Sequence, residues 1–177
     1  MRARLLILIA AVAGCVLCVP GNVAAQFGPN SRYLGFHVGV SGVGSAPALG
    51  MNGEMAYNNR VGIGAWFDTW SYGERLAFSG VSYDWNVRYI ALAGTAAYHF
   101  PVREEPRLDP FVGGALGYYV VSTSGDGFSG VNYTGSASRM FMGLYGGTRF
   151  AFNPSMSGVV RIGFGSSTLT LGLDFKL

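Results

Sequence analysis

Apolar and polar side chains alternate with a period of two along most of the chain. In the last ten residues, TLTLGLDFKL, every second position from Leu169 to Leu177 is leucine or phenylalanine, with Thr, Gly, Asp or Lys between them. This period is typical of a β-strand with one apolar face. The same alternation occurs from Leu34 to Val40 and from Val61 to Phe67. The pattern therefore predicts an all-β protein.

About eight strands are predicted, each joined to the next by a turn or loop. They are expected over residues 32–41, 49–57, 61–68, 85–100, 111–120, 139–152, 160–165 and 168–177. The connections are expected over residues 42–48, 58–59, 71–82, 101–110, 122–138, 153–155 and 165–167, which are rich in turn-forming residues. Near the start of the fourth strand, Asp84, Asn86 and Arg88 share a face with Ile90 and Leu92, so either a bulge intervenes or that end of the strand lies in water. The order favours an up-and-down barrel in which the last strand pairs with the first.

The composition of the two faces distinguishes a soluble barrel from a transmembrane one. A soluble, lipocalin-like barrel has its apolar face inside and a charged surface outside, whereas a transmembrane barrel exposes the apolar face to lipid. Only 12% of the residues are charged and the chain contains a single lysine, Lys176. Soluble globular domains have about 25% charged residues. An eight-stranded antiparallel transmembrane β-barrel is therefore predicted, with the soluble barrel as the alternative.

The first 25 residues have the three parts of a secretory signal. Arg2 and Arg4 precede an apolar segment over residues 5–19, and small residues end at Ala25. Cleavage there leaves residues 26–177 as the barrel and removes both cysteines, Cys15 and Cys18, so no disulfide is expected. The alternative is that the segment ending at Cys15, which is similar to a lipobox, makes Cys15 the lipidated first residue. Without Arg2 and Arg4 the basic and acidic residues nearly balance, and no nucleic-acid partner is predicted.

The chain resembles the small eight-stranded outer-membrane barrels of Gram-negative bacteria, the OmpA-type transmembrane domain and its OmpX-like relatives. The resemblance rests on the export signal, the strand count, stretches such as LDPFVGGALGYYV, and the alternating last strand. It implies export by the Sec pathway, periplasmic chaperones, and insertion by the barrel-assembly machinery. Such families commonly end on an aromatic residue that this machinery reads. In this chain Phe175 and Leu177 stand at the corresponding positions and are the expected assembly signal.

Polar residues on the face opposite the apolar side chains are the candidate site. They are expected in the lumen, where opposite charges pair and plug it, since an unpaired buried charge is costly; the alternative is an ion path. The set comprises Glu54, Asp68, Arg149, Arg161, Asp174, Lys176 and His37. His99 falls on the same face, and both histidines are expected to bond to neighbours. No catalytic, cofactor or metal site is predicted: Asp126 is isolated, and GDGFSG is followed by no helix that would make it a phosphate loop.

The predicted function is that of an integral outer-membrane protein with a structural or surface-interaction role, a plugged lumen and outward loops. A monomer in contact with the lipid bilayer is expected. Aromatic residues near strand ends are expected to form girdles at the membrane interface: Tyr57, Tyr98, Phe100, Phe150, Phe152 and Phe175. The alternatives are a narrow pore for small solutes and a barrel enzyme that modifies the acyl chains of lipid A.

Overall fold

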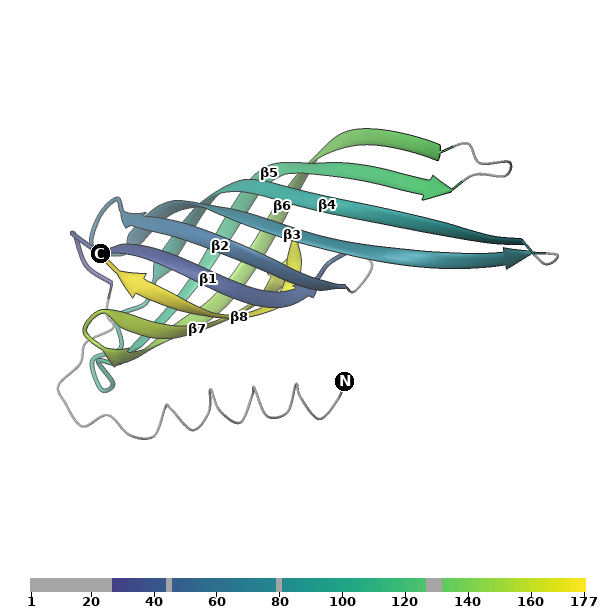
Figure 1. The fold of residues 1–177 in the computed structure, drawn as a ribbon. Coiled ribbons are helices and arrows are strands. Elements are labelled where there is room, and N and C mark those ends of the chain that lie inside the picture. The colour runs from purple at the N-terminus through teal and green to yellow at the C-terminus, as the bar shows by residue number, and fades with distance from the viewer. Residues whose placement is uncertain (1–26, 44–45, 79–80, 127–131) are drawn as a thin grey trace.

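Eight antiparallel strands form one closed barrel in the computed structural model (Figure 1). The structure describes residues 27–43, 46–78, 81–126 and 132–177. The predicted export signal, with Cys15 and Cys18, lies outside them. The strands are β1 (Arg32–Ser41), β2 (Pro47–Ala56), β3 (Val61–Phe78), β4 (Val81–His99), β5 (Leu108–Asp126), β6 (Asn132–Asn153), β7 (Met156–Phe164) and β8 (Ser167–Lys176). Each strand pairs with the next, and β8 pairs with β1, so the predicted fold and its closure are confirmed.

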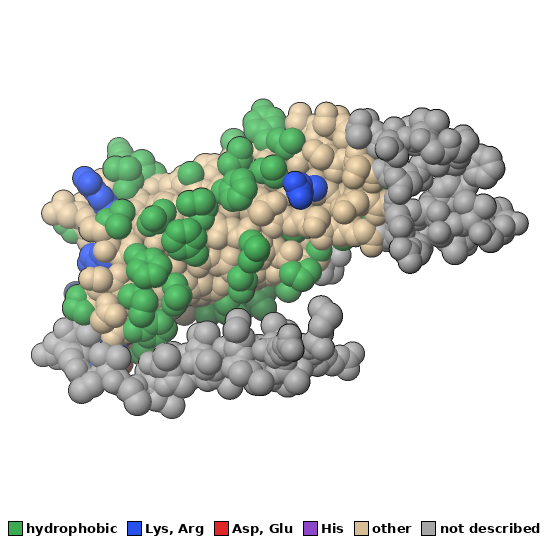
Figure 2. Space-filling view, in the orientation of Figure 1, with side chains coloured by type: hydrophobic (Ala, Val, Ile, Leu, Met, Phe, Trp, Pro, Cys, Tyr) green, Lys and Arg blue, Asp and Glu red, His purple; other side chains and the backbone are tan. Residues whose placement is uncertain are grey.

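The apolar face of each strand points outward. On β6, Met140, Met142 and Leu144 are 57%, 73% and 58% exposed, whereas Phe141 and Tyr145, at alternate positions of the same strand, are only 8% exposed. Hydrophobic side chains are spread over the visible wall of the barrel in Figure 2. This arrangement is the one expected of a transmembrane barrel and the reverse of a soluble one. Within the described residues, no helix is long and apolar enough to cross a bilayer.

The strands fall into two length classes. β1, β2, β7 and β8 have 9 or 10 residues, close to the roughly 9–11 residues that a strand needs to cross a bilayer. β3, β4, β5 and β6 have between 18 and 22 residues. Two hairpins, β3–β4 and β5–β6, therefore extend well beyond the rest of the barrel (Figure 1). We call this the hairpin end; the short-turn end is the opposite one, with the C-terminus and the β2–β3, β4–β5 and β6–β7 turns.

The long strands correct three predicted connections. Residues 71–82 and 122–138 were expected to be loops, but β3 continues to Phe78 and β5 to Asp126. The β3–β4 register is continuous from Val61 opposite Tyr98 to Phe78 opposite Val81, so there is no bulge at the start of β4. The third correction is that the loop expected over residues 101–110 is shorter, because β5 already begins at Leu108. Main-chain pairing with neighbouring strands outweighs the turn-forming composition of these segments.

Candidate functional site

Inward-facing glycines make room for polar side chains in the lumen. An eight-stranded barrel has an interior just wide enough for side chains to fill. A Cβ atom added to Gly35 would collide with the Asp174 carboxylate, and one added to Gly50 would collide with Asp68 and His37. These glycines therefore leave space that carboxylates and imidazoles occupy. Glycine weakens a strand in general, but at these positions a larger residue would exclude the site.

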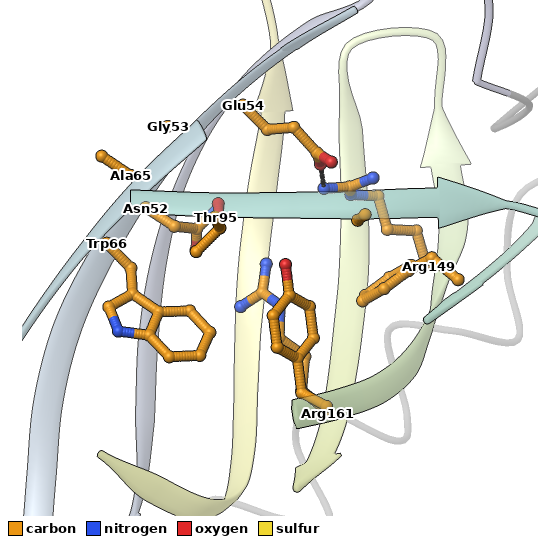
Figure 3. Close-up of a pocket in the computed structure, with 11 residues that line it drawn as sticks. Asn52, Gly53, Glu54, Ala65, Trp66, Thr95, Arg149 and Arg161 are labelled. Atoms are coloured by element: carbon orange, nitrogen blue, oxygen red, sulfur yellow. Dashed lines mark hydrogen bonds and ion pairs between the residues drawn. The ribbon is translucent and has the colours of Figure 1, made fainter. Parts of the chain in front are cut away.

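Arg149 on β6 lies at the centre of the lumen and is 1% exposed. Its Nε donates a hydrogen bond to Asp174 Oδ2 over 2.6 Å, and its Nη1 donates to Asp109 Oδ2 over 3.2 Å. Its Nη2 donates to Glu54 Oε2, the contact drawn in Figure 3. The guanidinium carbon also lies 4.3 Å from the centre of the Tyr33 ring, within cation–π distance. One arginine therefore joins carboxylates from β2, β5 and β8.

Asp174 on β8 is fully buried and accepts hydrogen bonds from two further side chains. Asn52 Nδ2 donates to its Oδ1 over 3.3 Å, and Arg161 Nη2 donates to its Oδ2 over 3.4 Å. Because Asn52 presents its amide nitrogen to Asp174, its oxygen faces His37 Nδ1, 3.3 Å away. His37 Nε2 lies 2.6 Å from Asp68 Oδ1. The network thus continues from Arg149 to Asp68.

Both histidines contact acceptors through both ring nitrogens. His99 Nδ1 lies 2.8 Å from Asp109 Oδ1, and its Nε2 lies 3.0 Å from Glu54 Oε1. An ionised carboxylate can only accept, so a ring nitrogen of His99 that carries a hydrogen can donate to the carboxylate it faces. His37 lies in a similar way between Asp68 and the Asn52 oxygen. Among the described residues the lumen network thus combines two arginines (Arg149 and Arg161) and two histidines (His37 and His99) with four carboxyl groups (Glu54, Asp68, Asp109 and Asp174).

The structure brings six of the seven predicted polar residues into this network: Glu54, Asp68, Arg149, Arg161, Asp174 and His37. It leaves out Lys176, which is exposed at the short-turn end of β8 and makes no ion pair with another described residue. Two members, Asn52 and Asp109, were not predicted. Asp109 lay in the segment expected to be a loop. The signal that could have found it is its alternation with Phe111, which faces inward.

Aromatic side chains fill the lumen on the hairpin side of the charged network. Trp70 stacks on Tyr89 with ring centres 5.0 Å apart, and Tyr119 stacks on Phe141 at 4.2 Å. Between the aromatic and charged groups lies a cavity of about 20 Å³, on which Trp66, Thr95 and Arg161 converge in Figure 3. That is room for about one water molecule. Within the described part of the chain, the lumen is occupied by side chains.

The serine and histidine contacts in the lumen do not form a nucleophile–base pair. Ser166 Oγ donates to Asp68 Oδ2, while His37 contacts the other oxygen of the same carboxylate. The carboxylate therefore lies between hydroxyl and imidazole, whereas an activated serine needs the imidazole beside its hydroxyl. No group of three or more metal-ligating side chains suited to a metal ion occurs among the described residues.

We expect Gly50→Val to prevent formation of the folded barrel, because its side chain would occupy the space of His37 and Asp68. Overpacking a tight interior costs roughly 1–3 kcal/mol or more. The readout is heat-modifiable migration on a gel, since a folded barrel migrates differently before and after boiling. Gly94→Val is the matched control, because a Cβ at Gly94 meets nothing within 4 Å. Equal folding of the two variants would contradict the packing argument.

A closed eight-stranded wall with an apolar exterior and an interior filled by paired polar and aromatic side chains is the architecture of the small transmembrane β-barrels of outer membranes. Solved structures show the same fold. The N-terminal β-barrel domain of Pseudomonas aeruginosa OprF is 14% identical, with a TM-score of 0.58 over 85% of this chain and 99% of that one. Ail, the attachment invasion locus protein of Yersinia pestis, solved with the heparin analogue sucrose octasulfate, is 15% identical, with a TM-score of 0.56 over 86% of this chain and 100% of that one.

No protein-family model and no curated protein matches the sequence. A designed transmembrane β-barrel also has the fold, with 13% identity and a TM-score of 0.50 over 86% of this chain and 99% of the design. A backbone that natural and designed sequences share at such low identity is set by the alternation of residues and the strand count. The likeness therefore establishes the fold.

Proposed function

We propose that this protein is an integral outer-membrane barrel that anchors an extended sheet at the cell surface and does not conduct solutes. The single observation that carries the proposal is the filled lumen. Paired charges around Arg149 and stacked aromatics around Tyr119 leave only a water-sized space between them. A pore needs a continuous water path, and an enzyme needs a nucleophile beside its base. The observed contacts favour neither.

The extended sheet is the part of the molecule suited to surface interaction. β4 pairs with β5 as far as Trp85 opposite Gly125, so the two long hairpins form one four-stranded sheet beyond the barrel. Its outward positions include serines in place of the apolar residues of the wall, such as Ser122 opposite Ser136. β2 pairs with β3 only as far as Trp70, so the described backbone of β3 beyond it forms an open edge. An open edge can accept a strand from another molecule.

The proposed orientation places the short-turn end in the periplasm and the hairpin end outside the cell. In outer-membrane barrels the periplasmic turns are short and the outward connections are long. The proposal includes export by the signal over residues 1–25, with periplasmic chaperones and the barrel-assembly machinery as partners during biogenesis. The last strand, with Phe175 and Leu177, serves as the assembly signal. The mature protein is proposed to be a monomer.

Conductance in planar lipid bilayers tests the sealed lumen. Purified barrel that shows heat-modifiable folding is expected to give no steady ion current, because its lumen has no continuous water path. A triple variant, Trp66→Ala, Phe111→Ala and Tyr145→Ala, removes three inward aromatic rings that line the cavity. The charged network around Arg149 and the stacked rings around Tyr119 remain in this variant, so it is also expected to give no steady current. A porin with an open channel, reconstituted in the same bilayers, is the positive control.

Steady channels from the unaltered protein would overturn the sealed-lumen proposal in favour of a pore. Fractionation of cells that express the full chain tests the proposed location. The barrel is expected with the outer membrane, and recovery in the soluble periplasmic fraction would contradict that location.

A further inference from the structure

The outer wall of the barrel contains a groove across β1, β2 and β3 near the short-turn end. The groove has a volume of about 610 Å³, and its exposed walls are Arg32, Met55, Ile63 and Leu177. Arg32 pairs with Met55 across β1 and β2, and Met55 pairs with Ile63 across β2 and β3. These three side chains therefore form one row around the wall. The Leu177 N–H donates to the Arg32 carbonyl oxygen over 2.9 Å, which places Leu177 beside that row.

Gly53 forms the floor of this groove. It shares the outward face of β2 with Met51 and Met55, which are 40% and 50% exposed. A Cβ atom added to Gly53 would meet nothing nearer than the Tyr33 carbonyl oxygen at 3.9 Å. The missing side chain thus leaves a gap in an otherwise apolar wall. Gly53 pairs with Leu34 on β1 and with Ala65 on β3, and these three residues form the next row of the wall towards the hairpin end. The gap at Gly53 therefore extends the groove from the row that contains Arg32 into this second row.

Charge at the short-turn end favours an anionic occupant. Among the described residues outside the lumen, the charged side chains at this end are five basic ones against two acidic ones: Arg32, Arg60, Arg103, Arg107 and Lys176 against Glu104 and Glu105. Arg32 is exposed, and no ion pair joins it to another residue that the structure describes. A guanidinium binds phosphate oxygens through two parallel N–H donors. Basic residues at the edge of a membrane attract anionic headgroups.

We propose that this groove binds one molecule of an anionic glycerophospholipid. Its phosphate contacts the Arg32 guanidinium, and one acyl chain runs over Gly53 between Met55 and Ile63. The inference rests on the proposed function, because it requires the short-turn end to lie in a phospholipid leaflet. The occupant has an acyl chain because the exposed walls are apolar, and a phosphate because the exposed Arg32 guanidinium lies at the edge of the groove. Leu177 at the rim makes the C-terminus of the barrel part of the site.

Native mass spectrometry of the mature barrel in detergent tests this site. The barrel is titrated with phosphatidylglycerol and, separately, with phosphatidylcholine of the same acyl chains. One phosphatidylglycerol is expected to bind, with phosphatidylcholine at least several-fold weaker. Gly53→Leu fills the gap and is expected to weaken binding of phosphatidylglycerol about tenfold or more, because the added side chain takes the place of the acyl chain. Arg32→Gln is expected to abolish the preference between the two lipids.

Two control variants keep the test specific. Gly94→Leu adds the same side chain to an outward glycine of β4 with open space around it, and should leave binding unchanged. Arg88→Gln removes an exposed arginine near the hairpin end and should also have no effect. Each variant is first shown to fold by heat-modifiable migration. Equal binding by Gly53→Leu and the unaltered barrel, or equal binding of both lipids, would overturn the lipid site.

Failure of the lipid site can be distinguished from failure of the proposed function. A barrel that fractionates with the outer membrane and conducts no current, yet binds lipid equally well with leucine at position 53, disproves only the lipid site. A chain that is soluble without detergent disproves the proposed membrane location, and with it the lipid site.

Discussion

Replacement of Arg149 by methionine is expected to lower the free energy of unfolding of the barrel by about 3–5 kcal/mol, the usual cost of breaking a buried ion pair. Methionine keeps much of the volume but removes every donor that Arg149 provides to Glu54, Asp109 and Asp174. Three buried carboxylates would then share a lumen with fewer cations. The measurement is urea denaturation in detergent micelles, followed through the loss of the heat-modifiable band.

Two further variants separate the charge effect from a general loss of packing. Arg139→Met is the matched control, because Arg139 lies on the same strand and is exposed, so its replacement should change stability by less than about 0.5 kcal/mol. Asp174→Asn combined with Arg149→Met removes one of the unpaired charges and should recover part of the loss. Denaturation of the Arg149 variant at the same urea concentration as the unaltered protein would show that the network does not stabilise the barrel.

Introduction of arginine at Leu144 is expected to destabilise the barrel in lipid by roughly 1–4 kcal/mol, because a basic side chain on the lipid face costs about 2–4 kcal/mol at the bilayer midplane and less towards its edges. Leu144 is 58% exposed, and its outward neighbours are apolar: Met142 two positions before it on β6 and Phe164 opposite it on β7. The measurement is denaturation of barrels refolded into phospholipid vesicles, compared with the same variant in detergent.

Ser136→Arg on the same outward face of β6 is the matched control for Leu144→Arg. Ser136 pairs with Ser122 in the sheet beyond the barrel, so an arginine there should remain in water. Its effect on stability should be within about 0.5 kcal/mol, as for most surface substitutions. If the two arginines had equal effects, the assignment of the apolar wall to the bilayer would be wrong.

The fold could be predicted from the sequence for two reasons. The period of two assigns each residue to one face of a strand, and a single lysine is too few for the surface of a soluble barrel. The full lengths of β3 to β6 could not be predicted, because residues 71–82 and 122–138 have the composition of loops. What makes them strands is the continuous pairing of Phe78 with Val81 and of Asp126 with Asn132. Local composition does not reveal whether a partner strand is present, and β-propensity is strongly dependent on that context.

The sequence predicts most of the residues that form the lumen site, but it does not predict which of them contact each other. Alternation placed Arg149 and Asp174 on the inward face, but it could not show that one arginine joins three strands. It also included Lys176, which alternates correctly with Phe175 but lies where the wall of the barrel ends. Asp109 was missed because the prolines around it favoured a loop. Pro110 is tolerated in β5, and its carbonyl oxygen accepts the Phe100 N–H over 2.8 Å.

The position of Asp174 in β8 couples closure of the wall to pairing of the charges inside it. β8 both completes the wall against β1 and supplies the carboxylate that holds Arg149 and Arg161. A barrel without β8 would have two open edges and two arginines with a missing counter-ion. Errors in the wall and errors in the charged network should therefore occur together, so a partly closed barrel should be unstable on both counts.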